Sequence, residues 1–189
     1  MSLFKKIFGT VNDTSSEEEK LPVDELFTLN FKKNGGKFLY CENLPELRLL
    51  FENILLENDW FESDVACYEE NLTSLLEENK LNYTNPVNTK FLLSSCEALI
   101  GNEGSILFSS TQIKQNKPQE LPANIIVVAT TSQIVENKSD GLRLIKKRYS
   151  KDYPTNITTI KYFDKAKKEE DLHYGGVSKN LYLLLLEDL

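Results

Sequence analysis

The sequence is poor in the residues that most metal and redox sites use. It has one histidine and three cysteines in 189 residues, and the cysteines, at positions 41, 67 and 96, form no Cys-x-x-Cys pair. A zinc ribbon or an iron–sulfur ligand set needs closely spaced cysteines, so neither is encoded. We expect no metal and no other cofactor. An odd number of cysteines without a signal peptide is typical of a reducing compartment, and we predict a cytoplasmic protein.

Basic residues and long apolar runs are also scarce. Lys and Arg number 22 against 29 Asp and Glu, which gives a net charge of −7. This balance argues against a general nucleic-acid binder, because such a protein needs a basic face for the phosphates. No apolar run approaches the roughly 18 residues of a membrane span, so we expect no transmembrane segment and no secretory signal. Hydrophobic residues make up 40% of the chain, enough to fill the core of one domain.

The first 24 residues differ from the rest. Within residues 1–9, four apolar and two basic residues fall on opposite faces of a helical pattern: Leu3, Phe4, Ile7 and Phe8, and Lys5 and Lys6. Residues 10–24 are polar and acidic, which predicts a linker. We therefore predict a segment with its linker over residues 1–24 and a single domain over 25–189. The segment has three open interpretations: it docks on its own body or on a twin subunit in a homodimer, it anchors to a membrane surface, or it is disordered.

Beyond the linker, apolar runs alternate with helical patterns. Asn43 is a predicted helix cap, with Pro45 in the first turn and Glu46 three residues after the cap, and this helix ends near Glu57. Further helices are expected over 71–79 and 132–149. Strands are expected at 38–41, 65–68, 91–93, 98–100, 105–108, 125–129, 157–160 and 181–186. This order is typical of an α/β fold with a mostly parallel sheet flanked by helices.

Ligands of such sheets bind beyond the carboxyl ends of the strands, which selects three loops that we expect to converge on one crevice. The first is the turn with Glu103, Gly104 and Ser105. Its backbone N–H groups and the Ser105 hydroxyl can contact a ligand, and a partly desolvated Glu103 can act as base or nucleophile. The structural alternative, which the spacing alone favours, is an ordinary hairpin turn in which Asn and Gly relieve backbone strain.

The second and third loops likewise have a functional explanation, as a ligand site, and a purely structural one. Thr130 and Thr131 precede the predicted helix at 132, so they form either an anion site or a helix cap. Gly175, Gly176 and Ser178 precede the last strand and form either a ligand-facing loop or a plain turn. A P-loop is rejected at this position, because that motif needs a following helix.

Several blocks of the second half also occur together in one family. The stretch 102–110, the Leu-Pro start of 121–128, the Ile-Val of 132–135 and the glycine pair before the last strand follow its order and spacing. They resemble the LUD domain family of lactate utilisation, relatives of LutC and YkgG. The remaining chain is similar to short, divergent LUD-like proteins of Bacteroidetes-type bacteria. Two family motifs are missing: residues 159–166 carry no Gly-Pro-Ser, and no His-Gly-Pro follows Gly175.

The resemblance implies a NagB/RpiA/CoA-transferase-like three-layer sandwich. It also implies a role near the oxidation of L-lactate, beside a partner subunit that holds iron–sulfur clusters. We therefore expect an accessory, non-catalytic protein that binds a small anionic metabolite or a partner subunit. One alternative is an acyl- or CoA-transferase-like enzyme, because related transferases use a glutamate nucleophile in a turn similar to that of Glu103. The other is a structural protein tethered through residues 1–9.

Overall fold

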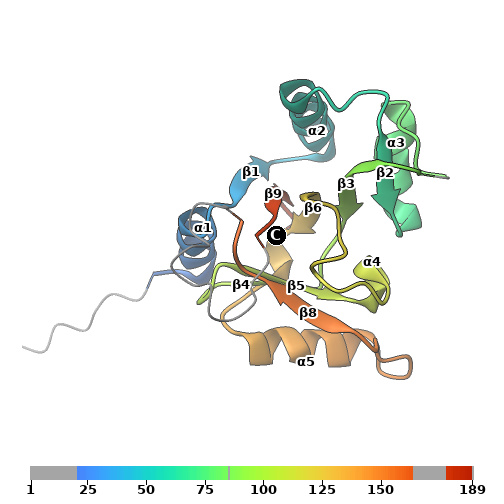
Figure 1. Ribbon diagram of the computed structural model, residues 1–189. Coiled ribbons are helices and arrows are strands. Elements are labelled where there is room, and N and C mark those ends of the chain that lie inside the picture. The colour runs from blue at the N-terminus through green and yellow to red at the C-terminus, as the bar shows by residue number, and fades with distance from the viewer. Residues whose placement is uncertain (1–20, 85, 164–177, 189) are drawn as a thin grey trace, which may run out of the picture.

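The computed structural model describes residues 21–84, 86–163 and 178–188 (Figure 1). In this part of the chain, five strands form a parallel sheet in the order β1-β9-β6-β3-β2. The strands are β1 (Lys37–Cys41), β2 (Asp64–Cys67), β3 (Thr89–Ser94), β6 (Asn124–Thr130) and β9 (Asn180–Leu186). The predicted α/β architecture with a mostly parallel sheet is confirmed.

Four further strands form a second, mixed sheet in the order β7-β4-β5-β8. They are β4 (Ala98–Ile100), β5 (Ser105–Ser109), β7 (Ile134–Val135) and β8 (Ile157–Ile160). β5 runs antiparallel to both of its neighbours, whereas β7 runs parallel to β4. The sequence predicted three of these strands but not that they form a separate layer.

The two faces of the parallel sheet are covered differently (Figure 1). α2 (Leu44–Asn58) and α3 (Thr73–Glu78) pack on one face, while α1 (Val23–Lys33) and the second sheet pack on the other. α5 (Lys138–Arg148) covers the outer face of the second sheet. The central strand β6 serves both cores, because Ile125 and Val127 face the second sheet and Ile126 faces α2. Three short helices complete the described elements: η2 (Glu70–Leu72), α4 (Ser110–Ile113) and η3 (Thr131–Gln133).

One predicted helix boundary is confirmed and another is wrong. The Asn43 side chain accepts a hydrogen bond from the Glu46 N–H at 3.0 Å, so α2 begins where its cap predicts. The helix expected from residue 132 begins only at Lys138, with Asn137 as its cap. Residues 134 and 135 instead form β7, since their backbone completes the edge of β4. Tertiary pairing has overridden the local helical pattern there.

A buried carboxylate joins α5 to the second sheet. Glu97 is fully buried, and the Arg148 guanidinium donates to one of its oxygens at 2.6 Å. The other oxygen accepts from Ser109, Gln112 and Tyr149 at 2.6, 3.0 and 2.9 Å. A buried charge is tolerated when its lone pairs are satisfied in this way, so this network fixes the end of α5.

α1 is fixed against the β4–β5 turn that carries Glu103. Its apolar face buries Phe27 and Phe31 completely. The Asn30 side chain donates to the Gly101 carbonyl at 2.9 Å, and the Asn34 side chain donates to the Glu103 carbonyl at 2.7 Å. At Gly104 the backbone has φ +59°, and a Cβ there would lie 2.3 Å from the backbone of α1. The glycine is therefore required for the close approach of helix and turn.

We expect Gly104→Ala to destabilise the protein by about 2 kcal/mol or more. Alanine is strained at this positive φ, and its Cβ would also overlap the backbone of α1. The control is Glu103→Gln, which loses only a partly exposed ion pair to Lys138, 3.2 Å long, and should cost about 1 kcal/mol or less. Urea unfolding followed by circular dichroism measures both. Equal stability of Gly104→Ala and the native chain would contradict the described contact.

We expect Val127→Asp to unfold the protein, because Val127 has no exposed surface and an unpaired charge in the core costs several kcal/mol. Val87→Asp is the matched control, since Val87 is 93% exposed. Thermal melts distinguish the two: the control should keep the native melting temperature. A cooperative, near-native melt of Val127→Asp would mean that β6 does not lie between the two cores.

Candidate functional site

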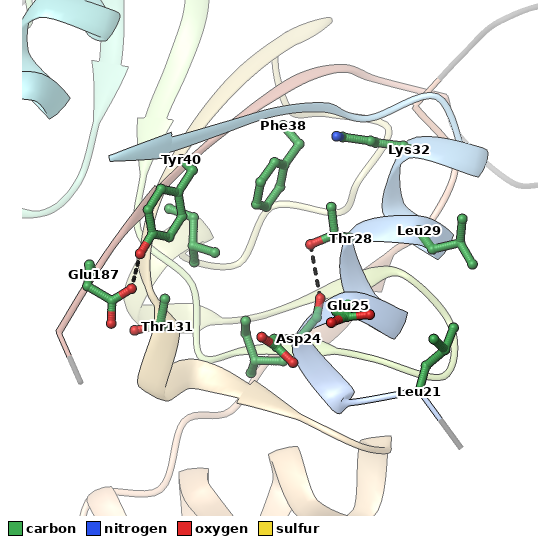
Figure 2. A pocket seen from close by; sticks show the side chains of 12 residues that line it. Leu21, Asp24, Glu25, Thr28, Leu29, Lys32, Phe38, Tyr40, Thr131 and Glu187 are labelled. Carbon is green, nitrogen blue, oxygen red and sulfur yellow. Dashed lines mark hydrogen bonds between the residues drawn. The ribbon is translucent and has the colours of Figure 1, made fainter. Parts of the chain in front are cut away.

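An open groove of about 850 Å³ lies between α1 and the edge of the parallel sheet (Figure 2). One wall is the outward face of α1, the floor is formed by β1 and β9, and the third side is the loop after β6. The lining residues are Leu21, Asp24, Glu25, Thr28, Leu29, Lys32, Phe38, Tyr40, Thr131, Ile134, Leu185 and Glu187. We call this feature the α1 groove.

The periodicities of a helix and a strand place these side chains in the α1 groove. The two buried phenylalanines of α1 face the core, which leaves Thr28, Leu29 and Lys32 on its outer side. Alternate residues of a strand share one face, so Phe38 and Tyr40 both point into the groove (Figure 2). Leu21, Leu29 and Tyr40 are each more than 40% exposed. Apolar side chains gathered on an open surface are typical of a binding site.

The charged groups of the α1 groove are mostly acidic. Asp24 and Glu25 come from the first turn of α1, and Glu187 accepts a hydrogen bond from the Tyr40 hydroxyl (Figure 2). The Lys32 ammonium lies 5.3 Å from the centre of the Phe38 ring. Among the described lining residues, three carboxylates therefore face one ammonium group. This surface favours an apolar ligand that also carries positive charge.

The predicted anion loop at the rim of the groove already holds a carboxylate. The Thr131 hydroxyl and the Ser132 N–H donate to one oxygen of Asp188 at 2.8 and 2.9 Å, and the Ser132 hydroxyl donates to the other at 2.6 Å. These bonds, that of the Ser132 hydroxyl above all, lower the pKa of Asp188 to about 2. Thr130 lies beside this contact, and its N–H donates to the Gln133 side chain at 2.8 Å.

The Glu103 turn does not line the α1 groove. The Glu103 carboxylate pairs with Lys138 at 3.2 Å and accepts from the Ser105 hydroxyl at 3.3 Å, while Ser105 is fully buried. Gly104 packs on α1. The geometry thus gives each of these residues a structural contact, and their predicted contact with a ligand stays a prediction.

Ser178 lies near the amino end of β9, whereas Thr130 lies at the carboxyl end of the neighbouring strand β6. It precedes the first residue of β9, which pairs with the first residue of β6, whereas Thr130 is the last residue of β6. The length of the strand separates the two positions by roughly 20 Å. For Ser178, the expectation that the three loops converge on one crevice is therefore wrong. The Ser178 hydroxyl is buried without a hydrogen-bond partner among the described residues, and Gly175 and Gly176 lie outside that part of the chain.

The cysteines do not gather into a reactive or metal-binding centre. Burial raises the pKa of the Cys41 thiol to about 11, and it also raises that of the fully buried Cys96. Cys41 and Cys67 lie on opposite edge strands of the parallel sheet, roughly 19 Å apart by strand spacing. Across the described ranges, no group of three or more His, Cys, Asp and Glu can hold a metal ion. Nor does any helix there have the length and apolar character needed to cross a bilayer.

Sequence reasoning missed the wall and floor of the α1 groove. It assigned residues up to 24 to a linker and chose loops after strands, whereas the groove uses a helix face and a strand face. A helix signal was present over 23–33: Pro22 precedes it, Asp24 and Glu25 lie in the first turn, and basic residues fill the last turn. Phe27 and Phe31, four residues apart, mark its buried side.

Comparisons with known proteins give the family and the fold. Residues 58–186 match the LUD domain family. The crystal structure of a DUF162 family protein from Deinococcus radiodurans superposes with a TM-score of 0.61 at 14% identity, over 89% of this chain and all of that one. This likeness supports the fold alone. A ribose 5-phosphate isomerase A from Methanocaldococcus jannaschii gives a TM-score of only 0.32 at 9% identity, over 82% of this chain and 88% of that one.

None of the curated proteins matches the sequence. The NagB/RpiA/CoA-transferase-like grouping therefore stays a prediction from the resemblance, since a TM-score of 0.32 bears no argument. The assignment to the LUD family rests on a match over more than half of the chain, from the end of α2 to the end of β9. The chain belongs to the LUD domain family.

Proposed function

We propose that this protein is an accessory, non-catalytic member of the LUD family that serves lactate or organic-acid utilisation by binding a partner subunit through the α1 groove. The observation that carries the proposal is an open groove in which Leu21, Leu29 and Tyr40 remain exposed within a rim of carboxylates. The occupant that fits is an apolar segment of the partner with lysine or arginine beside it. The expected partner is the iron–sulfur oxidoreductase subunit that the family resemblance implies.

A protein segment fits the α1 groove better than a small anionic metabolite does. The excess of carboxylates repels an anion, and a small hydroxy acid leaves most of an 850 Å³ groove unfilled. The loop at the rim that accepts a carboxylate is already bound to Asp188. Exposed tyrosine side chains such as Tyr40 are, in contrast, enriched among the anchors of protein interfaces.

A transferase reaction through Glu103 has less support from the geometry. Its carboxylate is paired with Lys138, and the carbonyls of its turn accept from α1. A nucleophile needs room for an acyl group beside it, and the α1 groove does not reach this turn. The cysteine thiols offer no substitute, because burial raises the pKa of Cys41 and Cys96. These contacts support a binding role over a catalytic one.

Leu29→Asp should weaken binding of the partner by at least about tenfold, because it puts a charge among groups that the partner must desolvate. Leu29 is 56% exposed, so folding is expected to be unaffected. The matched control is Leu49→Asp on α2, since Leu49 is 57% exposed and lies away from the α1 groove. The measurement is isothermal titration of each full-length variant with the purified iron–sulfur subunit of the same organism's lactate-oxidising system.

The native chain and Leu49→Asp should bind with the same Kd, and thermal melts of all three proteins should coincide. If the native chain does not bind the subunit, the partner is misidentified and the proposed function fails. If Leu29→Asp binds as tightly as Leu49→Asp, the α1 groove is not the binding surface.

A further inference from the structure

The described part of the chain begins at the α1 groove. Leu21, the first described residue, is itself one of the lining residues and is 44% exposed. Residues 1–20 precede it directly. A stretch the length of residues 10–20 spans at most roughly 35–40 Å when extended, so residues 1–9 can reach any part of the groove from this attachment point.

The composition of residues 1–9 complements the α1 groove. The groove offers apolar side chains from Leu29 and Phe38 beside the carboxylates of Asp24 and Glu25. The segment carries Leu3, Phe4, Ile7 and Phe8 together with two lysines, and no acidic residue. Its pattern places the apolar residues on one side and the lysines on the other, which is the arrangement that an acidic groove with an apolar floor accommodates.

We propose that residues 1–9 dock in the α1 groove of their own chain, between α1 and β1. A short tether gives the segment an effective concentration of roughly millimolar at the groove. That concentration exceeds that of a second copy in a dilute solution, so the segment of the same chain occupies the site first. Docking also removes Leu29 and Tyr40 from water, which a free monomer otherwise leaves exposed.

This docking regulates the proposed partner site, and in that respect it rests on the proposed function. A partner segment must displace residues 1–9 before it reaches Leu29. The apparent affinity for the partner is therefore the intrinsic affinity multiplied by the fraction of chains in which the groove is free. Phe4→Asp together with Ile7→Asp removes two apolar anchors from the segment and leaves every described groove residue unchanged.

Photo-cross-linking in the full-length protein tests the docking without any partner. Phe4 is replaced by p-benzoylphenylalanine, the protein is irradiated at low micromolar concentration, and cross-linked peptides are identified by mass spectrometry. We expect cross-links within one chain to peptides that contain Leu29, Phe38 or Tyr40. Leu29→Asp or the charge reversal of Lys5 and Lys6 to Glu should lower their yield several-fold, and Leu49→Asp should not change it.

Three outcomes would overturn the inference: cross-links that avoid the α1 groove, cross-links to the groove found only in covalent dimers, or a yield that Leu29→Asp leaves unchanged. The second outcome assigns the groove to the segment of a twin subunit. Titration with the partner separates the two proposals. If the Phe4→Asp/Ile7→Asp variant binds no tighter than the native chain, the regulation fails while the partner site stands. If cross-links form but no variant binds the subunit, only the proposed function fails.

Discussion

The packing of α1 against the second sheet is the constraint on which both candidate sites depend. Burial of Phe27 and Phe31 contributes roughly 3–6 kcal/mol, and the amides of Asn30 and Asn34 bind the turn below. These contacts hold α1 in place as a wall of the α1 groove. Its inner side commits the Glu103 turn to structural contacts, while its outer side creates the α1 groove. A single helix thus holds the turn of one predicted site and forms the wall of a groove that the sequence did not predict.

The parts of the fold that could be predicted are those where the local pattern and the tertiary environment agree. The apolar run in β6 is buried on both faces, and α2 has its cap, its proline and its apolar stripe in register. The predicted start of α5 failed because Ile134 and Val135 fit a helical spacing with later residues, whereas the free edge of β4 decided their conformation. A two-residue strand carries no periodicity from which it can be recognised.

The candidate site was harder to predict from the sequence than the fold, and the reason lies in the topology. The rule that ligands bind beyond the carboxyl ends of parallel strands identified Thr131, which does line the α1 groove. It does not apply to Glu103, because β4 and β5 form an antiparallel hairpin of the second sheet. It also fails for Ser178, which lies before a parallel strand and not after it. The groove itself joins Leu29 to Tyr40 across two elements whose mutual position no local pattern specifies.

The family match and the α1 groove cover different parts of the chain, and this limits what membership implies. Nine of the twelve lining residues lie outside residues 58–186: eight come from α1, β1 and Leu21, and the ninth is Glu187. The LUD region supplies four of the five strands of the parallel sheet, the buried Glu97 network and the loop at Thr131. The acidic wall and the aromatic floor come from the N-terminal elements. Recognition at this groove is therefore set by residues that the family match does not include, and its partner has to be identified on this chain itself.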